Sequence, residues 1–265
     1  MGKSNDVCCA IWVCLKECQI DGVATVLLKR HRDLRLLDVG SGAVQRRGMK
    51  MTVLMAASFR DGVAIAADTL LHDPSTMRCV MNSAKTMLVG GCVGIAQAGS
   101  FTGTQSVWKE LEKIDPRTVT PASVADLIMG SASKIYAEKV KKGEASMTRY
   151  LVAGYNADGV QEIRSVGVDL GKSHCFSGEG HIAAVGTLPN ATDIATQAVK
   201  DSLKRLTNTF KIDEWVQRVV AAEAAASPEA VGFPATLLLI KPSQVVQAQI
   251  EEGKPHNPLL EGLFA

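Results

Sequence analysis

The chain lacks several features that would assign it to other classes of protein. None of its apolar runs reaches the 18 or more residues that a membrane-spanning helix needs. Its formal net charge is only +2 over 265 residues, and beyond residue 51 it has no basic stripe of the kind that nucleic-acid-binding surfaces carry. We therefore expect neither a membrane nor a nucleic acid among its partners.

Charge and cysteine content separate the first 51 residues from the rest. Residues 1–51 hold nine of the 29 Lys and Arg but only five of the 27 Asp and Glu, so the remainder is slightly acidic. Four of the seven cysteines lie in the first 18 residues, without the C-x-x-C spacing of a zinc site. Cys79, Cys92 and Cys175 remain, and such unpaired cysteines favour a reducing, cytoplasmic location. We predict neither a metal nor another cofactor.

Thr52 opens a stretch that is typical of a β-hairpin. Residues 52–58 are small and mostly apolar, and Asp61-Gly62 is a strong signal for a tight turn between two strands. The second strand ends at Asp68. The pattern therefore predicts that Asp68 returns to lie beside Thr52.

A second hairpin is predicted farther along the chain. Strands over 85–89 and 92–97 flank a turn at Gly90-Gly91. Lys85 stands at the start of the first strand, and Gly99 follows the second. We expect the two hairpins to bring four candidate residues to one end of a sheet, namely Thr52, Asp68, Lys85 and Gly99.

These four residues supply the parts of an N-terminal-nucleophile hydrolase. A hydroxyl is a weak nucleophile until a base takes its proton, and the α-amine of a terminal Thr52, with a reference pKa of about 8, is such a base. The ammonium of Lys85 lowers the pKa of a nearby amine by like-charge repulsion, and Asp68 can hold the lysine. The backbone N–H of Gly99 can stabilise the oxyanion.

Most of residues 52–240 resembles the proteasome β-subunit family, and above all its simpler bacterial members. The resemblance rests on Thr52, Ile65-Ala-Ala-Asp68, Lys85 and Ala98-Gly99, and more loosely on 150–159, 182–186 and 232–240. It implies an α+β fold of the four-layer α/β/β/α type and a threonine-type endopeptidase. It also implies homo-oligomeric stacked rings, an unfolded protein or peptide as substrate, and an ATPase partner.

The sequence departs from the family's pattern in the residues that support the site. Val53 stands where many active members have a second Thr or Ser, and the loop at 69–84 is one residue longer than usual. Thr187 and Glu229 are the candidate substitutes for the supporting Ser and Asp residues of the family. Two alternatives therefore stay open, a catalytically inactive structural ring subunit and a non-compartmental N-terminal-nucleophile amidohydrolase.

We divide the chain into a leader (1–51), a hydrolase domain (52–242) and an exposed C-terminal tail (243–265). The leader is a pro-segment removed by self-cleavage, a targeting or regulatory extension, or the product of a start assigned too early. We favour the last, because Met51 before a small Thr is what methionine aminopeptidases remove. Pro-segments of the family usually place Gly before the Thr.

Helices are predicted by apolar residues that recur near a spacing of 3.6. The second of them has a clear start at Thr120-Pro121, a capping residue followed by proline. The four predicted helices cover residues 100–114, 121–143, 190–206 and 212–226.

Overall fold

The fold is built on two antiparallel sheets. The structure, a computed structural model, describes residues 23–27, 52–72, 79–99, 101–143, 147–203 and 209–263. The larger sheet has six strands, in the order β1 (Val23–Leu27), β11 (His181–Val185), β2 (Leu54–Phe59), β3 (Gly62–Asp68), β13 (Ala235–Lys241) and β14 (Gln244–Ile250). The predicted mixed α and β fold with antiparallel sheets is confirmed.

The second sheet has five strands. Their order is β10 (Lys172–Ser177), β9 (Gln161–Gly167), β8 (Thr148–Tyr155), β7 (Val93–Gly99) and β6 (Thr86–Val89). Two short ribbons accompany the sheets, β4 (Leu70–His72) with β5 (Cys79–Asn82) and β12 (Thr209–Lys211) with β15 (Glu261–Leu263).

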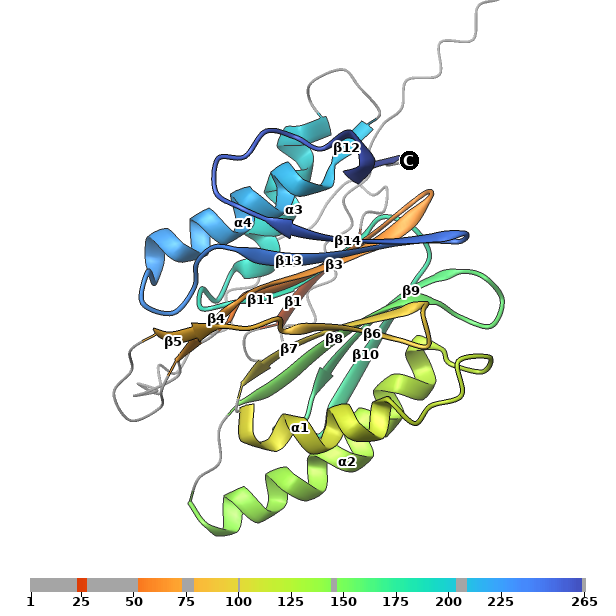
Figure 1. The fold of residues 1–265 in the computed structure, drawn as a ribbon, viewed down its shortest axis with the longest axis vertical. Coiled ribbons are helices and arrows are strands. Elements are labelled where there is room, and N and C mark those ends of the chain that lie inside the picture. The colour runs from red at the N-terminus through yellow and green to blue at the C-terminus, as the bar shows by residue number, and fades with distance from the viewer. Residues whose placement is uncertain are drawn as a thin grey trace, which may run out of the picture.

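Helices cover the outer faces of the two sheets, which face each other at the centre of the molecule (Figure 1). Helices α3 (Ala191–Leu203) and α4 (Ile212–Ala226) lie over the six-stranded sheet, and α1 (Phe101–Leu111) and α2 (Pro121–Lys141) lie over the five-stranded sheet. In the residues that the structure describes, no helix is long and apolar enough to cross a membrane.

The alternation of side chains along β2 explains why the central hairpin is apolar on both faces. Met55, Ala57 and Phe59 join the cluster under α3 and α4, whereas Leu54 and Ala56 join the cluster between the sheets. Successive residues of a strand point to opposite faces, and here both faces are covered. Every residue of β2 and β3 is therefore buried.

The two predicted hairpins are confirmed, and so are the four helices over the residues that the structure describes, to within a few residues; the predicted ends at 100 and 204–206 lie outside those residues. In the first hairpin Phe59 pairs with Gly62, and in the second Val89 pairs with Val93. Helix α2 begins as predicted, because Thr120 accepts a hydrogen bond from the Ser123 N–H and Ser123 accepts one in return.

The loop expected at 69–84 contains structure that the sequence does not indicate. Strands β4 and β5 form a short ribbon there, with a shift of register between Leu71 and His72. Three- and four-residue strands carry too little alternation to be recognised from sequence.

Most described residues of the tail over 243–265 are exposed, as expected, but the tail is not an extension outside the fold. Strand β14 pairs along its whole length with β13, and β15 pairs with β12. A 3₁₀ turn, η1 (Pro258–Leu260), places Leu260 in the core with 1% of its surface exposed, whereas Leu259 is 68% exposed. Only Ile250 of strand β14 is buried, and its other residues are exposed or half-buried. The sequence of this strand is therefore typical of a solvent-exposed segment.

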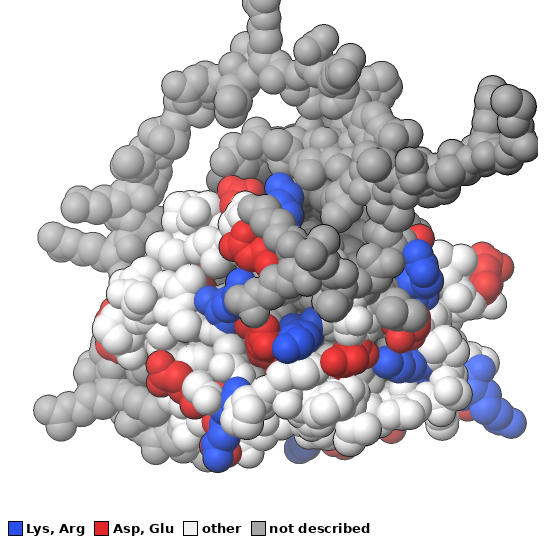
Figure 2. Space-filling model, turned by 90° about the horizontal axis from the view of Figure 1, so that it is seen from above, with Lys and Arg blue, Asp and Glu red and all other residues white. Residues whose placement is uncertain are grey.

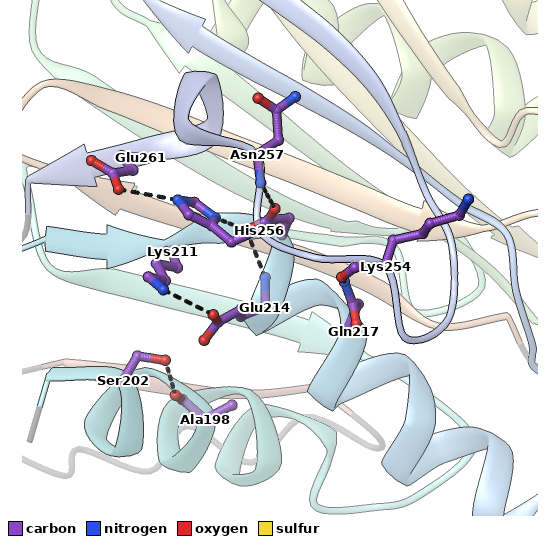
Figure 3. Close-up of polar contacts among 10 residues, drawn as sticks. Ala198, Ser202, Lys211, Glu214, Gln217, Lys254, His256, Asn257 and Glu261 are labelled. Atoms are coloured by element: carbon purple, nitrogen blue, oxygen red, sulfur yellow. Dashed lines mark hydrogen bonds and ion pairs between the residues drawn. The ribbon is translucent and has the colours of Figure 1, made fainter. Parts of the chain in front are cut away.

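A polar cluster fastens this C-terminal segment to the start of α4 (Figure 3). The Nδ1 atom of His256 lies 2.6 Å from Asp213 Oδ1, and its Nε2 atom lies 3.1 Å from Glu261 Oε1. The N–H of Asn257 donates to Asp213 Oδ2 at 2.7 Å, and the N–H of Glu214 donates to Oδ1 at 2.9 Å. The buried carboxylate of Asp213 is thus the point to which the segment is attached.

Candidate active site

Lys85 links two of the predicted site residues. Its Nζ atom donates to the hydroxyl oxygen of Thr52 and, at 2.9 Å, to Oδ2 of Asp68. Asp68 is fully buried and Lys85 is 7% exposed, so the ion pair is shielded from water. Thr52 is partly exposed. The structure thus brings Thr52, Asp68 and Lys85 into one contiguous group.

The ends of three strands position these side chains. Leu54 pairs with Ala67 across the first hairpin, and one step farther the N–H of Asp68 donates to Val53 O at 3.2 Å. Thr52 therefore lies at the open end of that hairpin. Lys85 immediately precedes β6, which faces this end from the second sheet. The lysine side chain spans the space between the two sheets.

Asp68 is held by the backbone as well as by Lys85. Its Oδ1 accepts the Val53 N–H at 3.0 Å, and its Oδ2 accepts the Leu70 N–H at 3.1 Å. Burial raises the pKa of the Asp68 carboxyl, while the charge and hydrogen bond of Lys85 and the two backbone donors act in the opposite direction. With both oxygens bonded, the carboxylate has one fixed orientation toward Lys85.

Gly99 and Lys85 lie at the same end of the second sheet, where β7 ends and β6 begins. The N–H of Gln97, two residues earlier, donates to Lys85 O at 3.0 Å. Gly99 itself has a φ of +115°, and a Cβ there would lie 2.1 Å from Met147 O. Glycine is therefore the residue that this tight strand end accepts.

The two predicted supporting residues have different positions. Thr187 follows β11 in a turn near the start of β2, and its N–H donates to Glu223 Oε2 at 2.8 Å. Glu229 is exposed between α4 and β13, and it has no hydrogen-bond or ion-pair partner among the described residues. The carboxylate that the structure brings to the Thr187 turn belongs to Glu223.

Sequence reasoning missed Glu223, although one signal was available. It is the single charged residue in the run Val219-Val-Ala-Ala-Glu-Ala-Ala-Ala226, and such a residue within an apolar helix is fully buried only when it has partners. The identity of those partners depends on a tertiary contact that the sequence does not reveal.

A pocket of about 260 Å³ adjoins the site on the β13 side of the hairpin. Thr69, next to Asp68, and Ala84, next to Lys85, are among its lining residues, but Thr52 is not. The other lining residues are mostly polar, namely Asn82, Ser83, Pro234, Thr236, Gln247, Ala248 and Gln249. In the described part of the chain, no group of three or more His, Cys, Asp or Glu could hold a metal ion.

Comparisons with known proteins bear on the fold. No protein-family model matches the chain, and no curated protein matches it. Among solved structures, the fold is similar to that of the Gly-1 mutant of Anbu from Hyphomicrobium sp. strain MC1, with a TM-score of 0.56 and 14% sequence identity. The match covers 77% of this chain and 88% of that one. At this identity the likeness shows the fold alone.

Proposed function

We propose that the chain is a threonine-type endopeptidase of the N-terminal-nucleophile class, with a four-layer α/β/β/α hydrolase domain over 52–242. The observation that carries the proposal is the buried ammonium of Lys85, which bonds both the hydroxyl of Thr52 and the carboxylate of Asp68. Burial of a charge costs free energy unless the charge is paired. A lysine without a role at this position would therefore be expected to extend into solvent.

The proposed reaction begins once Thr52 is the first residue. Its Oγ1 attacks the carbonyl carbon of a peptide bond, and its α-amine, directly or through a water, takes the hydroxyl proton. Lys85 lowers the pKa of that amine and orients the hydroxyl, and Asp68 orients Lys85. The Gly99 N–H stabilises the oxyanion, the proton passes to the leaving amine, and water hydrolyses the acyl-threonine ester.

The assembly is part of the same proposal. The proteasome-like fold and the likeness to Anbu support a homo-oligomer, for which we propose stacked rings with the Thr52 sites facing an inner chamber. Such a chamber would admit unfolded chains, delivered by an ATPase partner in a cytoplasmic setting.

Peptide hydrolysis by a matched set of chains tests the proposal. A chain produced from Met51 and trimmed to Thr52 is expected to cleave fluorogenic peptides, whereas its Thr52→Ala variant is expected to be inactive and Thr52→Ser to retain activity. A chain that retains residues 1–51 has no free amine at Thr52 and is expected to be inactive. Equal cleavage by the Thr52→Ala variant would refute the mechanism.

Other outcomes would favour the alternatives. A trimmed chain that assembles but neither cleaves peptides nor reacts at Thr52 would be a structural subunit. Hydrolysis of small amides by a monomer or dimer, measured by light scattering, would favour the non-compartmental amidohydrolase.

A further inference from the structure

The turn over 186–188 is held from the helical layer by one side chain. Glu223 Oε2, near the end of α4, accepts the N–H of Thr187 at 2.8 Å and the N–H of Leu188 at 3.1 Å. The carboxylate also rests on Gly186, where a Cβ would lie 2.3 Å from Oε1. Any larger residue at Gly186 would displace the glutamate.

One oxygen atom of this carboxylate has no hydrogen-bond partner in the described part of the chain. Glu223 is fully buried, and its Oε1 atom has no hydrogen bond to any described residue. An unpaired buried carboxylate oxygen is costly, and such a group in a native structure has a specific reason, for example a catalytic role or a bound water.

The position of the carboxylate relates it to Thr52. Val185 pairs with Leu54 at the end of the β11–β2 register, so the 186–188 turn follows β11 at the point where β2 begins. Glu223, which bonds this turn, therefore lies near the start of β2. Burial raises the pKa of the Glu223 carboxyl, and the negative charge of Asp68, which is paired with Lys85, raises it further.

We propose that Glu223 is a positioning residue of the Thr52 site, which holds the 186–188 turn against the start of β2 and offers Oε1, directly or through one water, to the freed α-amine of Thr52. This inference rests on the proposed function. It assigns to Glu223 the supporting part that the sequence suggested for Glu229. Lys85 and Glu223 then act on the amine with opposite signs, the ammonium favouring the neutral base and the carboxylate favouring the ammonium form.

The substitution Glu223→Gln separates the charge from the structural role. Glutamine keeps a carbonyl oxygen for the two backbone N–H groups but removes the negative charge. We expect the pKa of the Thr52 α-amine to fall by about one unit. The acidic limb of the kcat/KM profile should move to lower pH by the same amount. Because the amine is less well placed, kcat should fall about 10- to 100-fold with KM unchanged.

Two further variants complete the comparison. Glu252→Gln removes an exposed carboxylate from the turn after β14 and should change neither the amine pKa nor the pH profile. Glu223→Asp keeps the charge but shortens the side chain by one methylene, so it should preserve more of the amine pKa than glutamine does. A wild-type amine pKa and pH profile in a folded Glu223→Gln protein would overturn the inference.

The amine titration also distinguishes this inference from the proposed function. In a chain that begins at Thr52, the α-amine pKa is obtained from the pH dependence of its arylation by dinitrofluorobenzene, followed by mass spectrometry of the N-terminal peptide. This readout needs no peptidase activity. A Glu223-dependent amine pKa in a protein that cleaves nothing would retain the contact and reject the peptidase. An active enzyme whose amine is indifferent to Glu223 would do the reverse.

Discussion

At the scale of single residues, the candidate site is an arrangement of two buried charges around a hydroxyl. Lys85 has its ammonium shared between Thr52 and Asp68, and Asp68 has both oxygens bonded. The backbone donors from Val53 and Leu70 fix the orientation of the carboxylate. Such a preorganised pair is costly to bury and is worth keeping where chemistry needs a fixed charge.

Asp68→Asn should therefore destabilise the protein strongly. The change leaves the Lys85 ammonium buried without its counter-charge, which typically costs about 3–5 kcal/mol. Denaturant unfolding measures the loss. Asp115→Asn is the control, because Asp115 pairs with Arg117 on the surface and its loss should leave stability within error. Equal effects of the two substitutions would show that the Lys85–Asp68 pair is not effectively buried.

The buried glutamate predicts a pH-dependent difference in stability. Burial raises the pKa of the Glu223 carboxyl, opposed by the Leu188 and Thr187 N–H groups. A folded-state pKa above the unfolded value of about 4.3 means that stability is lost as pH rises from the unfolded to the folded pKa. Glu223→Gln cannot ionise, so its Tm relative to wild type should increase over this window. A Tm difference that stays constant with pH would contradict the shift.

At the scale of elements, the strand and helix signals that were strong in the sequence are the ones that the structure contains. The turn signals at Asp61-Gly62 and Gly90-Gly91 join apolar runs, and both hairpins form there, with turns over residues 60–61 and 90–92. Strand β14 was missed because its outward residues are polar and its pairing with β13 is a tertiary fact. Thr52, Asp68 and Lys85 could be proposed as a group because two local hairpins place them. Glu223 could not, because its contact with Thr187, 36 residues away, is tertiary.

The docking of the C-terminal segment depends on His256. His256→Ala should leave the Asp213 carboxylate without its side-chain partner and cost about 1–2 kcal/mol locally. Amide hydrogen exchange in β15 should then speed up about tenfold or more, while exchange in β13 stays unchanged. Lys254→Ala is the control, since Gln217 bonds only the backbone oxygen of Lys254. Unchanged exchange in β15 would show that Asp213 and His256 do not anchor the segment.

At the scale of the whole molecule, residues before Thr52 take part in the larger sheet. Strand β1 occupies its edge and pairs with β11 over five residue pairs, from Val23 with Val185 to Leu27 with His181. On the face seen in Figure 2, acidic and basic side chains are interspersed, and neither sign forms a continuous patch. The edge strand thus distinguishes the leader-containing molecule from one that begins at Thr52.

Removal of residues 1–51 should change the association state. It exposes the backbone N–H and C=O groups of β11, and an unpaired edge favours pairing with another chain. Light scattering is expected to show a larger assembly for the chain that begins at Thr52 than for the full chain. A monomer in both cases would contradict both this expectation and the proposed rings.

The central claim is that Thr52 uses its own hydroxyl and its own α-amine together. A peptide epoxyketone tests both groups at once, because stable ring formation requires a hydroxyl and a free amine on the same residue. The account predicts one adduct on the N-terminal peptide of a chain that begins at Thr52, abolished by Thr52→Ala and slowed at least about 100-fold by Lys85→Ala. An unlabelled Thr52, or an adduct elsewhere in the chain, would contradict it.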